Sequence, residues 1–182
     1  MTSDTTELVE RVRRRLKEHD SPFKIAGPVP EPVITAAEAA LGCTFPPSYR
    51  KFLRTFGGIT IPTHLGVVHE FVGVSADVPQ PPPLVEGEPP PPAPNTDDVV
   101  GRTLRAREQK LIAEHLVVVG MGAQYQEWFC LDLSRPTSSG EYPVLLYDAR
   151  DNALDQQFYD DFGQMLTEVM GFVADNLDHP LD

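Results

Sequence analysis

The hydrophobic residues near the start of the chain recur every four positions. Leu8, Val12 and Leu16 form this repeat, and Asp4 precedes it with the spacing of a capping box. The pattern predicts a helix within residues 1–20.

Two more helices are predicted after residues 21–33, a segment with four prolines that is expected to be extended. Thr35 opens a second capping box before an alanine-rich helix, and Gly42 is placed to end that helix in the left-handed conformation. Pro47 can occupy the first turn of a third helix, which Gly57-Gly58 ends. Its apolar residues form one stripe that we expect to be buried, made up of Tyr49, Phe52, Leu53 and Phe56.

The remaining residues alternate between strand patterns and helix patterns. A helix is predicted after a cap at Asn95 or Thr96, residues 120–126 are predicted to form a hairpin turn, and a last helix is predicted over residues 158–177. Runs of β-branched and aromatic residues predict strands at residues 59–61, 66–74, 116–119, 127–133 and 142–147.

Proline is concentrated in one segment, because nine of the 19 prolines lie between Pro79 and Pro94. Residues 78–98 are therefore expected to be a polyproline-biased insertion in a domain that spans residues 21–177, with a short tail at 178–182. A proline-rich tract can bind aromatic grooves, but an inserted loop is the favoured interpretation.

The formal net charge of −12 is unevenly distributed. Residues 141–182 contain ten acids and one base, a net charge of −9, whereas residues 1–20 contain five of each. This negative field repels nucleic acid and would speed the encounter with a basic partner. Charge alone favours a simpler explanation, since acidic surfaces also keep proteins soluble.

The cellular compartment is predicted from three features. The only cysteines, Cys43 and Cys130, lie among apolar neighbours and are too few for a disulfide framework. The N-terminal residues have no apolar signal segment, and no apolar run is long enough to span a bilayer. We expect a cytoplasmic protein with reduced thiols.

Short matches to catalytic or metal motifs do not extend to a complete site. Ser48 and Lys51 have Ser-x-x-Lys spacing, but the partner motifs Ser-Asp-Asn and Lys-Thr-Gly are absent. Cys130 lies in a predicted strand, without the surroundings that activate a thiol. His64 and His69 lack a third ligand at a recognisable spacing. We expect no catalytic residue, metal or cofactor.

The corner between the second and third predicted helices carries a distinctive motif. Glu-x-x-Leu-Gly at residues 38–42 is followed by Phe-Pro, a tyrosine and Phe-Gly-Gly at residues 56–58. This arrangement resembles the signature of the SUKH superfamily, although Phe45 and Phe56 stand where that family usually has Leu and Asn. Less specific similarity extends over residues 34–174. The residues of this chain that match the family motif are expected to have structural roles. They are Glu38, Leu41, Gly42, Pro46, Tyr49, Phe52 and Gly58.

The resemblance implies an α+β fold, a single domain with a central, mostly antiparallel β-sheet flanked by helices. It also implies a non-catalytic protein-binding domain, because bacterial members are thought to bind and neutralise toxins, often nucleases. With the acidic end of the chain, this gives the hypothesis of an immunity protein for a basic cognate toxin, with no nucleic-acid or membrane partner. The expected contact residues are Asp148, Asp151, Asp155, Asp160 and Asp161.

Two other functions stay open. A regulatory scaffold of the same superfamily could recruit partners through the proline-rich segment. A small hydrolase could use Ser48 or Cys130, although we expect no such activity.

Overall fold

The computed structural model describes residues 3–18, 23–75, 96–123, 127–148 and 153–178. The helices in these ranges are α1 (Ser3–Glu18), α2 (Glu31–Leu41), α3 (Pro47–Thr55), α4 (Val99–Glu108) and α5 (Phe162–Asp178). The strands are β1 (Lys24–Ile25), β2 (Ile59–Thr60), β3 (Val68–Phe71), β4 (Leu116–Gly122), β5 (Glu127–Asp132), β6 (Val144–Asp148) and β7 (Ala153–Tyr159).

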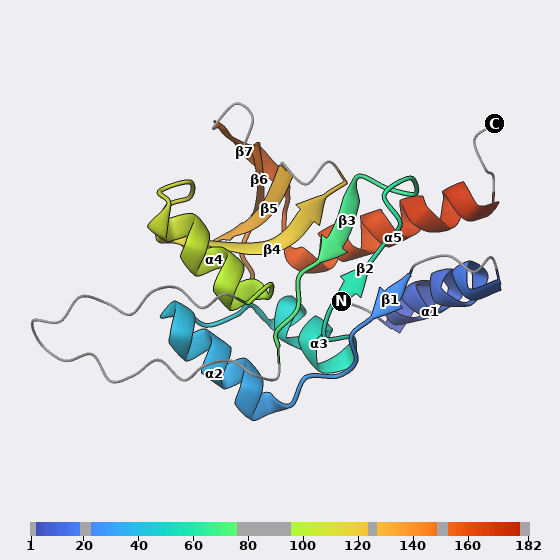
Figure 1. Ribbon diagram of the computed structural model, residues 1–182, viewed down its shortest axis with the longest axis horizontal. Helices are drawn as coiled ribbons and strands as arrows, with labels where there is room; N and C mark the ends of the chain where they lie inside the picture. The colour runs from blue at the N-terminus through green and yellow to red at the C-terminus, as the bar shows by residue number, and fades with distance from the viewer. Residues whose placement is uncertain (1–2, 19–22, 76–95, 124–126, 149–152, 179–182) are drawn as a thin grey trace, which may run out of the picture.

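The strands form one seven-stranded sheet in the order β1-β2-β3-β4-β5-β6-β7, in which every pair is antiparallel (Figure 1). Helix α1 packs against α5, α3 also contacts α5, and α4 packs beside β4. The expected α+β fold with an antiparallel sheet and flanking helices is therefore confirmed.

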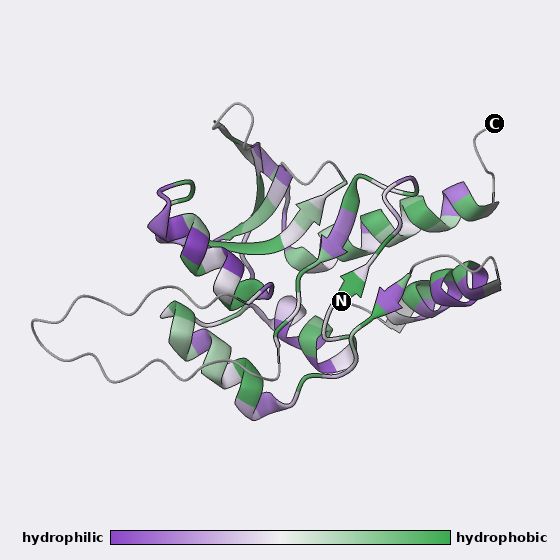
Figure 2. Ribbon diagram, viewed as in Figure 1, coloured by the Kyte–Doolittle hydropathy of each residue, from purple (hydrophilic) through white to green (hydrophobic). Residues whose placement is uncertain are grey.

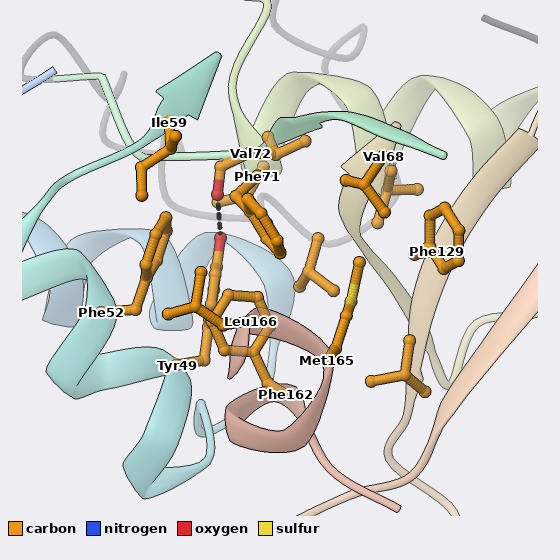
Figure 3. Packing of buried hydrophobic residues seen from close by; sticks show 14 of the residues in the cluster. Tyr49, Phe52, Ile59, Val68, Phe71, Val72, Phe129, Phe162, Met165 and Leu166 are labelled. Carbon is orange, nitrogen blue, oxygen red and sulfur yellow. Dashed lines mark hydrogen bonds between the residues drawn. The ribbon is translucent and has the colours of Figure 1, made fainter. Parts of the chain in front are cut away.

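The apolar stripe of α3 lies at the centre of the core, as predicted. Tyr49, Phe52 and Leu53 are completely buried, and the rings of Tyr49 and Phe52 lie 4.8 and 5.1 Å from the ring of Phe162 (Figure 3). The Tyr49 hydroxyl donates a hydrogen bond of 2.7 Å to the Val72 carbonyl. Helix α3 is thereby fixed to both α5 and the end of β3.

Helix α2 begins five residues earlier than the capping box at Thr35 predicted. The helix starts at Glu31 after Pro30, and Pro32 lies in its first turn, where a missing N–H costs nothing. Thr35 is therefore inside the helix. The predicted end is correct, since Gly42 has φ 65°.

Glycine is required at one crossing of the backbone. Gly57 has φ 70°, and a Cβ at this position would overlap the carbonyl of Gly27. A Cβ on Gly73 would overlap the carbonyl of Gly57 in the same way. These glycines let three chain segments touch beside β1, β2 and β3.

Three other predicted elements differ from the structure. The last helix begins at Phe162, because Phe158 and Tyr159 belong to β7, whose Tyr159 pairs with Val144. Strand β4 continues through Gly122, so residues 120–122 of the turn predicted at residues 120–126 belong to the strand, while residues 124–126 lie outside the described residues. Helix α4 is capped by Asp98, whose carboxylate accepts the Gly101 N–H at 2.9 Å.

The hydropathy pattern of α1 matches its packing. Val9, Val12 and Leu16 are buried, whereas Arg11, Arg13 and the other basic residues of this helix are exposed (Figure 2). The described residues contain no helix that is long and apolar enough to cross a membrane.

Candidate partner-binding surface

The motif residues hold the corner between α2 and α3 together. The buried Glu38 carboxylate accepts the Phe45 N–H at 2.7 Å and pairs with the Arg50 guanidinium at 2.5 Å. Arg50 also pairs with Glu31. The remaining motif residues also have structural roles. Leu41 is buried, Gly42 ends α2, Pro46 occupies the position before α3, and Gly58 packs against the backbone of Gly73.

Ser48 is bound to a carboxylate from a distant loop. Glu141 accepts the Ser48 hydroxyl at 2.6 Å and the Ser48 N–H at 2.9 Å. Because Pro46 has no side-chain acceptor, Glu141 serves as the cap of α3. This structural role accounts for the hydroxyl of the Ser-x-x-Lys match.

Neither cysteine has the environment of a reactive thiol. Burial raises the pKa of Cys130 to about 12. Burial also raises the pKa of Cys43 to about 11, although the charge of Arg107 opposes the change. Both side chains are therefore thiols, not thiolates, near neutral pH.

The two histidines of the β2–β3 region occupy different environments. His64 is exposed, and a ring nitrogen of His69 lies 2.7 Å from the Ile61 carbonyl oxygen. Within the described ranges, no group of three or more histidine, cysteine or acidic side chains could hold a metal ion.

Three of the five predicted acidic contact residues lie on or beside β7, which forms an edge of the described sheet. Asp148 is half-buried at the end of β6, opposite Ala153, and Asp155 belongs to β7. Asp160 follows β7 at the other end and is exposed, while Asp151 lies outside the described residues. We call this surface, from Asp148 along β7 to Asp160, the acidic edge.

The acidic edge is a strip and not a single cluster. At about 3.3 Å per residue, β7 separates Asp148 from Asp160 by roughly 20 Å. Leu154 and Phe158 lie between them with exposed fractions of 48% and 50%. Apolar side chains among charged neighbours are typical of a protein-binding surface.

The backbone of β7 is poorly suited to pairing with another strand. Its register with β6 shifts twice, between Val144 and Leu145 and between Leu145 and Tyr147. Such irregularities bend an edge strand and discourage strand addition. A partner would thus bind the acidic edge through side chains.

Asp161 has a structural role at the start of α5. Its carboxylate accepts the Gln164 N–H at 2.8 Å, and its carbonyl accepts the Met165 N–H at 3.1 Å. Asp161 is thus the cap of α5. Asp160 instead accepts a bond of 2.8 Å from the Gln157 side chain.

The sequence analysis did not predict a cleft that lies between α4 and the sheet. Arg102, Arg105, Ala106 and Gln109 recur at helical spacing, which is the local signal of a shared face. The sheet residues opposite them lie on β4 and β5, the next two strands in the chain. We call this cleft the α4 cleft. It has a volume of about 210 Å³ and is lined by Asp97, Arg102, Arg105, Ala106, Gln109, Val118, Met121 and Trp128.

The model of the SMI1 / KNR4 family (SUKH-1) matches residues 28–168, which include the α2–α3 corner and the whole acidic edge. No curated protein matches the chain.

Proposed function

Because the chain belongs to the SMI1/KNR4 family (SUKH-1), we propose that it is a non-catalytic protein-binding domain that neutralises a cognate toxin by direct binding. The family supports a binding or regulatory role in general. The finer assignment to immunity depends on the surface of this particular chain.

One observation carries the assignment: the acidic end of the chain coincides with an exposed apolar strip. Residues 141–182 have a net charge of −9, and they form β6, β7 and α5. Strand β7, within this acidic part of the chain, exposes Leu154 and Phe158. A toxin that binds nucleic acid needs a positive cleft, to which such a surface is complementary.

The neutralising contact is expected to form in two stages. The acidic edge speeds the approach of a basic toxin, since long-range attraction acts before contact. Leu154 and Phe158 then provide apolar contact, which slows dissociation. The toxin is blocked because its cleft is occupied, without any chemical change.

The first experiment is to identify the neighbouring reading frames. The proposal predicts that one of them encodes a large secreted protein, whose C-terminal domain is then produced for binding and toxicity assays. We expect this domain to be toxic alone, harmless with the present chain, and bound to it in solution. Failure of the chain to bind or protect would contradict the proposal.

Charge reversal tests whether the acidic edge makes the contact. Changing Asp151, Asp155 and Asp160 to Lys should lower the association rate about tenfold or more at low salt. A control with the same change in charge replaces Glu7, Glu108 and Glu114, which are exposed on other parts of the chain. Equal effects of the two triple variants would remove the acidic edge from the proposal.

A deletion separates immunity from the scaffold alternative. Removing residues 79–94, which lie outside the described residues, should leave binding and protection unchanged if the protein is an immunity protein. Loss of the partner on this deletion would instead favour a scaffold that recruits proteins through its prolines.

A further inference from the structure

The end of β7 presents an aromatic ring that is held in place but only half covered. The Phe158 ring lies edge-on to the rings of Phe129 and Tyr159, with 5.9 and 5.2 Å between the ring centroids. It is nevertheless 50% exposed. Because neighbouring rings already fix its orientation, little order has to be gained when a partner covers it, and aromatic side chains are enriched in protein interfaces.

Two exposed carboxylates lie where β7 meets α5, and side-chain amides hold both of them. Asp160 accepts a hydrogen bond of 2.8 Å from the Gln157 amide, and Glu168 accepts one of 2.9 Å from the Gln164 amide. The Gln164 amide oxygen also accepts the Asp160 N–H at 2.6 Å, so one glutamine contacts both acidic residues. Neutral amides position the carboxylates without removing their charge.

No basic side chain compensates these two carboxylates. Strands β5, β6 and β7 and helix α5 contain no lysine, arginine or histidine. Neither Asp160 nor Glu168 takes part in an ion pair among the described residues. The positive N-terminal end of α5 is capped by Asp161 instead. The negative charge at the end of β7 is therefore complementary to a cation from outside the molecule.

Tyr159 adds a polar group that has no partner in the described part of the chain. This residue is only 8% exposed, and its hydroxyl forms no hydrogen bond with a described residue. The hydroxyl oxygen is not fully enclosed, in contrast to the unpaired Trp128 Nε1. Burial raises the pKa of Tyr159, and the charge of Glu168 raises it further, so the phenol lies near this carboxylate. A group bound to Glu168 could also supply the missing partner of this hydroxyl.

The chemistry of these side chains favours one kind of cation. Carboxylate and hydroxyl oxygens accept hydrogen bonds, and the amide N–H groups beside them already point to the carboxylates. An arginine guanidinium carries five donors and no acceptor, pairs with carboxylates through parallel hydrogen bonds, and stacks on aromatic rings. A lysine ammonium offers a point charge without this planar fork.

We infer that Phe158, Tyr159, Asp160 and Glu168 form the docking site of an arginine side chain of the partner protein, and we call this surface the β7–α5 junction. The guanidinium stacks on the Phe158 ring and donates to the carboxylates and to the Tyr159 hydroxyl. The inference rests on the proposed function, because it names the toxin group that the acidic edge receives. An arginine held at this junction is no longer available to the phosphates of nucleic acid.

Nuclear magnetic resonance tests the site with three short peptides. The probes are acetyl-Ala-Arg-Ala-amide, its lysine counterpart, and its citrulline counterpart, which keeps the shape of arginine without the charge. We expect the arginine peptide to shift the side-chain amide signals of Gln157 and Gln164 saturably, with a Kd of about 1–10 mM for so small a ligand. The lysine peptide should bind about threefold more weakly and the citrulline peptide at least about tenfold more weakly.

Variants of the junction have matched controls on α5. Glu168→Gln should weaken the arginine peptide about tenfold, and Phe158→Leu about threefold. Asp175→Asn and Phe172→Leu change the same kinds of exposed side chain elsewhere on α5, so both should leave binding unchanged. Equal binding of the three peptides, or equal effects of the junction and control variants, would overturn the inference.

Binding of the toxin domain separates the docking site from the proposed function. Glu168→Gln and Phe158→Leu should each raise the dissociation rate of that complex about threefold or more. Unchanged dissociation rates in both variants would overturn the docking site and leave toxin neutralisation standing. If no toxin domain binds but the arginine peptide titrates as expected, the docking site stands and the proposed function is wrong.

Discussion

At the scale of the residue, buried polar groups are positioned by specific hydrogen-bond partners. Asp132 is a clear case, because its carboxylate accepts the Ser134 hydroxyl at 2.5 Å and Arg135 Nε at 2.6 Å, with His115 at 3.8 Å. Burial alone would raise the pKa of Asp132, but the bonds from Ser134 and Arg135 hold this pKa below its ordinary value. The loop after β5 is thus tied to the end of the strand.

Replacing the Asp132 carboxylate should make the free energy of unfolding less dependent on pH in the acidic range. Because the pKa of Asp132 is lower in the folded protein, its contribution is present above the unfolded pKa of about 4 and is lost as the pH falls through the folded pKa. Asp132→Asn should lower the free energy of unfolding by about 1–3 kcal/mol at pH 7. The difference from the unsubstituted protein should shrink below pH 4 in urea titrations at several pH values.

A control variant is available on α5. Asp175 is exposed, so Asp175→Asn should change the free energy of unfolding little at any of these pH values. A constant difference between Asp132→Asn and the unsubstituted protein across the whole range would contradict the assigned pKa direction.

The cysteines give a second prediction at this scale. Burial raises the pKa of Cys130 to about 12, and this side chain is completely buried in β5. Cys43 is half-buried with a pKa of about 11. Iodoacetamide at pH 8 should therefore modify Cys43 slowly and Cys130 only after unfolding, as measured by mass spectrometry of digested samples. Rapid modification of Cys130 in the folded protein would show that β5 opens readily or that its thiol is activated.

At the scale of the element, the α2–α3 corner and the strands differ in what forms them. The corner is built from local signals: Gly42 ends α2, Pro47 begins α3, and Gly57 follows it. The strands β1 and β2 contain two residues each and exist through their pairing, in which Lys24 lies opposite Thr60. Local patterns therefore predict the corner and the strand at β2, but they do not predict β1, which lies in the proline-rich segment before α2.

The two glycines with positive φ at the corner should differ in their tolerance of a side chain. Gly42 has φ 65°, and a Cβ added there would have no neighbouring atom within 4 Å, so Gly42→Ala should cost about 1–2 kcal/mol of backbone strain. Gly57 has a similar φ of 70°, but its Cβ would also overlap the Gly27 carbonyl. Gly57→Ala should therefore destabilise the protein considerably more, by roughly 4 kcal/mol or greater.

Urea denaturation of both variants measures this difference. If the two substitutions cost the same, the close crossing of residues 27 and 57 would not contribute to the effect.

At the scale of the whole molecule, two surface features stand apart: the acidic edge and the α4 cleft. The acidic edge lies on β7 at one end of the sheet, and the α4 cleft lies where α4 meets β4 and β5. The proposed function concerns the acidic edge, where exposed carboxylates would attract a basic partner. In the cleft, Arg102 is paired with Glu70, and Arg105 with Asp97.

The proposed toxin complex should show the salt dependence of an electrostatically steered encounter. Between about 20 mM and 500 mM salt, the association rate should fall roughly tenfold or more, because the Debye length shrinks from about 20 Å to 4 Å. The dissociation rate should change much less, since the apolar contacts of Leu154 and Phe158 are not screened. Stopped-flow measurement that finds a salt-independent association rate would contradict the steering role of the acidic edge.

The candidate site is only partly predictable from the sequence, because its residues come from elements that meet only in the folded protein. Charge along the chain points to Asp148, Asp155 and Asp160, but it cannot show that they are spread along β7 or that Asp161 caps α5. The α4 cleft has no sequence signature of its own, because Arg105 and Trp128 belong to separate elements. Their proximity arises from the packing of a helix on a sheet.

The sequence by itself determined the family, the α2–α3 corner and the buried stripe of α3, because caps, glycine conformations and helical periodicity act between residues a few positions apart. Tertiary structure alone decided the strand identity of residues 153–159, the start of α5 at Phe162 and the cap that Glu141 provides for α3. A strand forms only when its backbone pairs with another strand, and a cleft forms only where two elements pack together. Sequence patterns between nearby residues therefore cannot show which residues belong to such a strand or cleft.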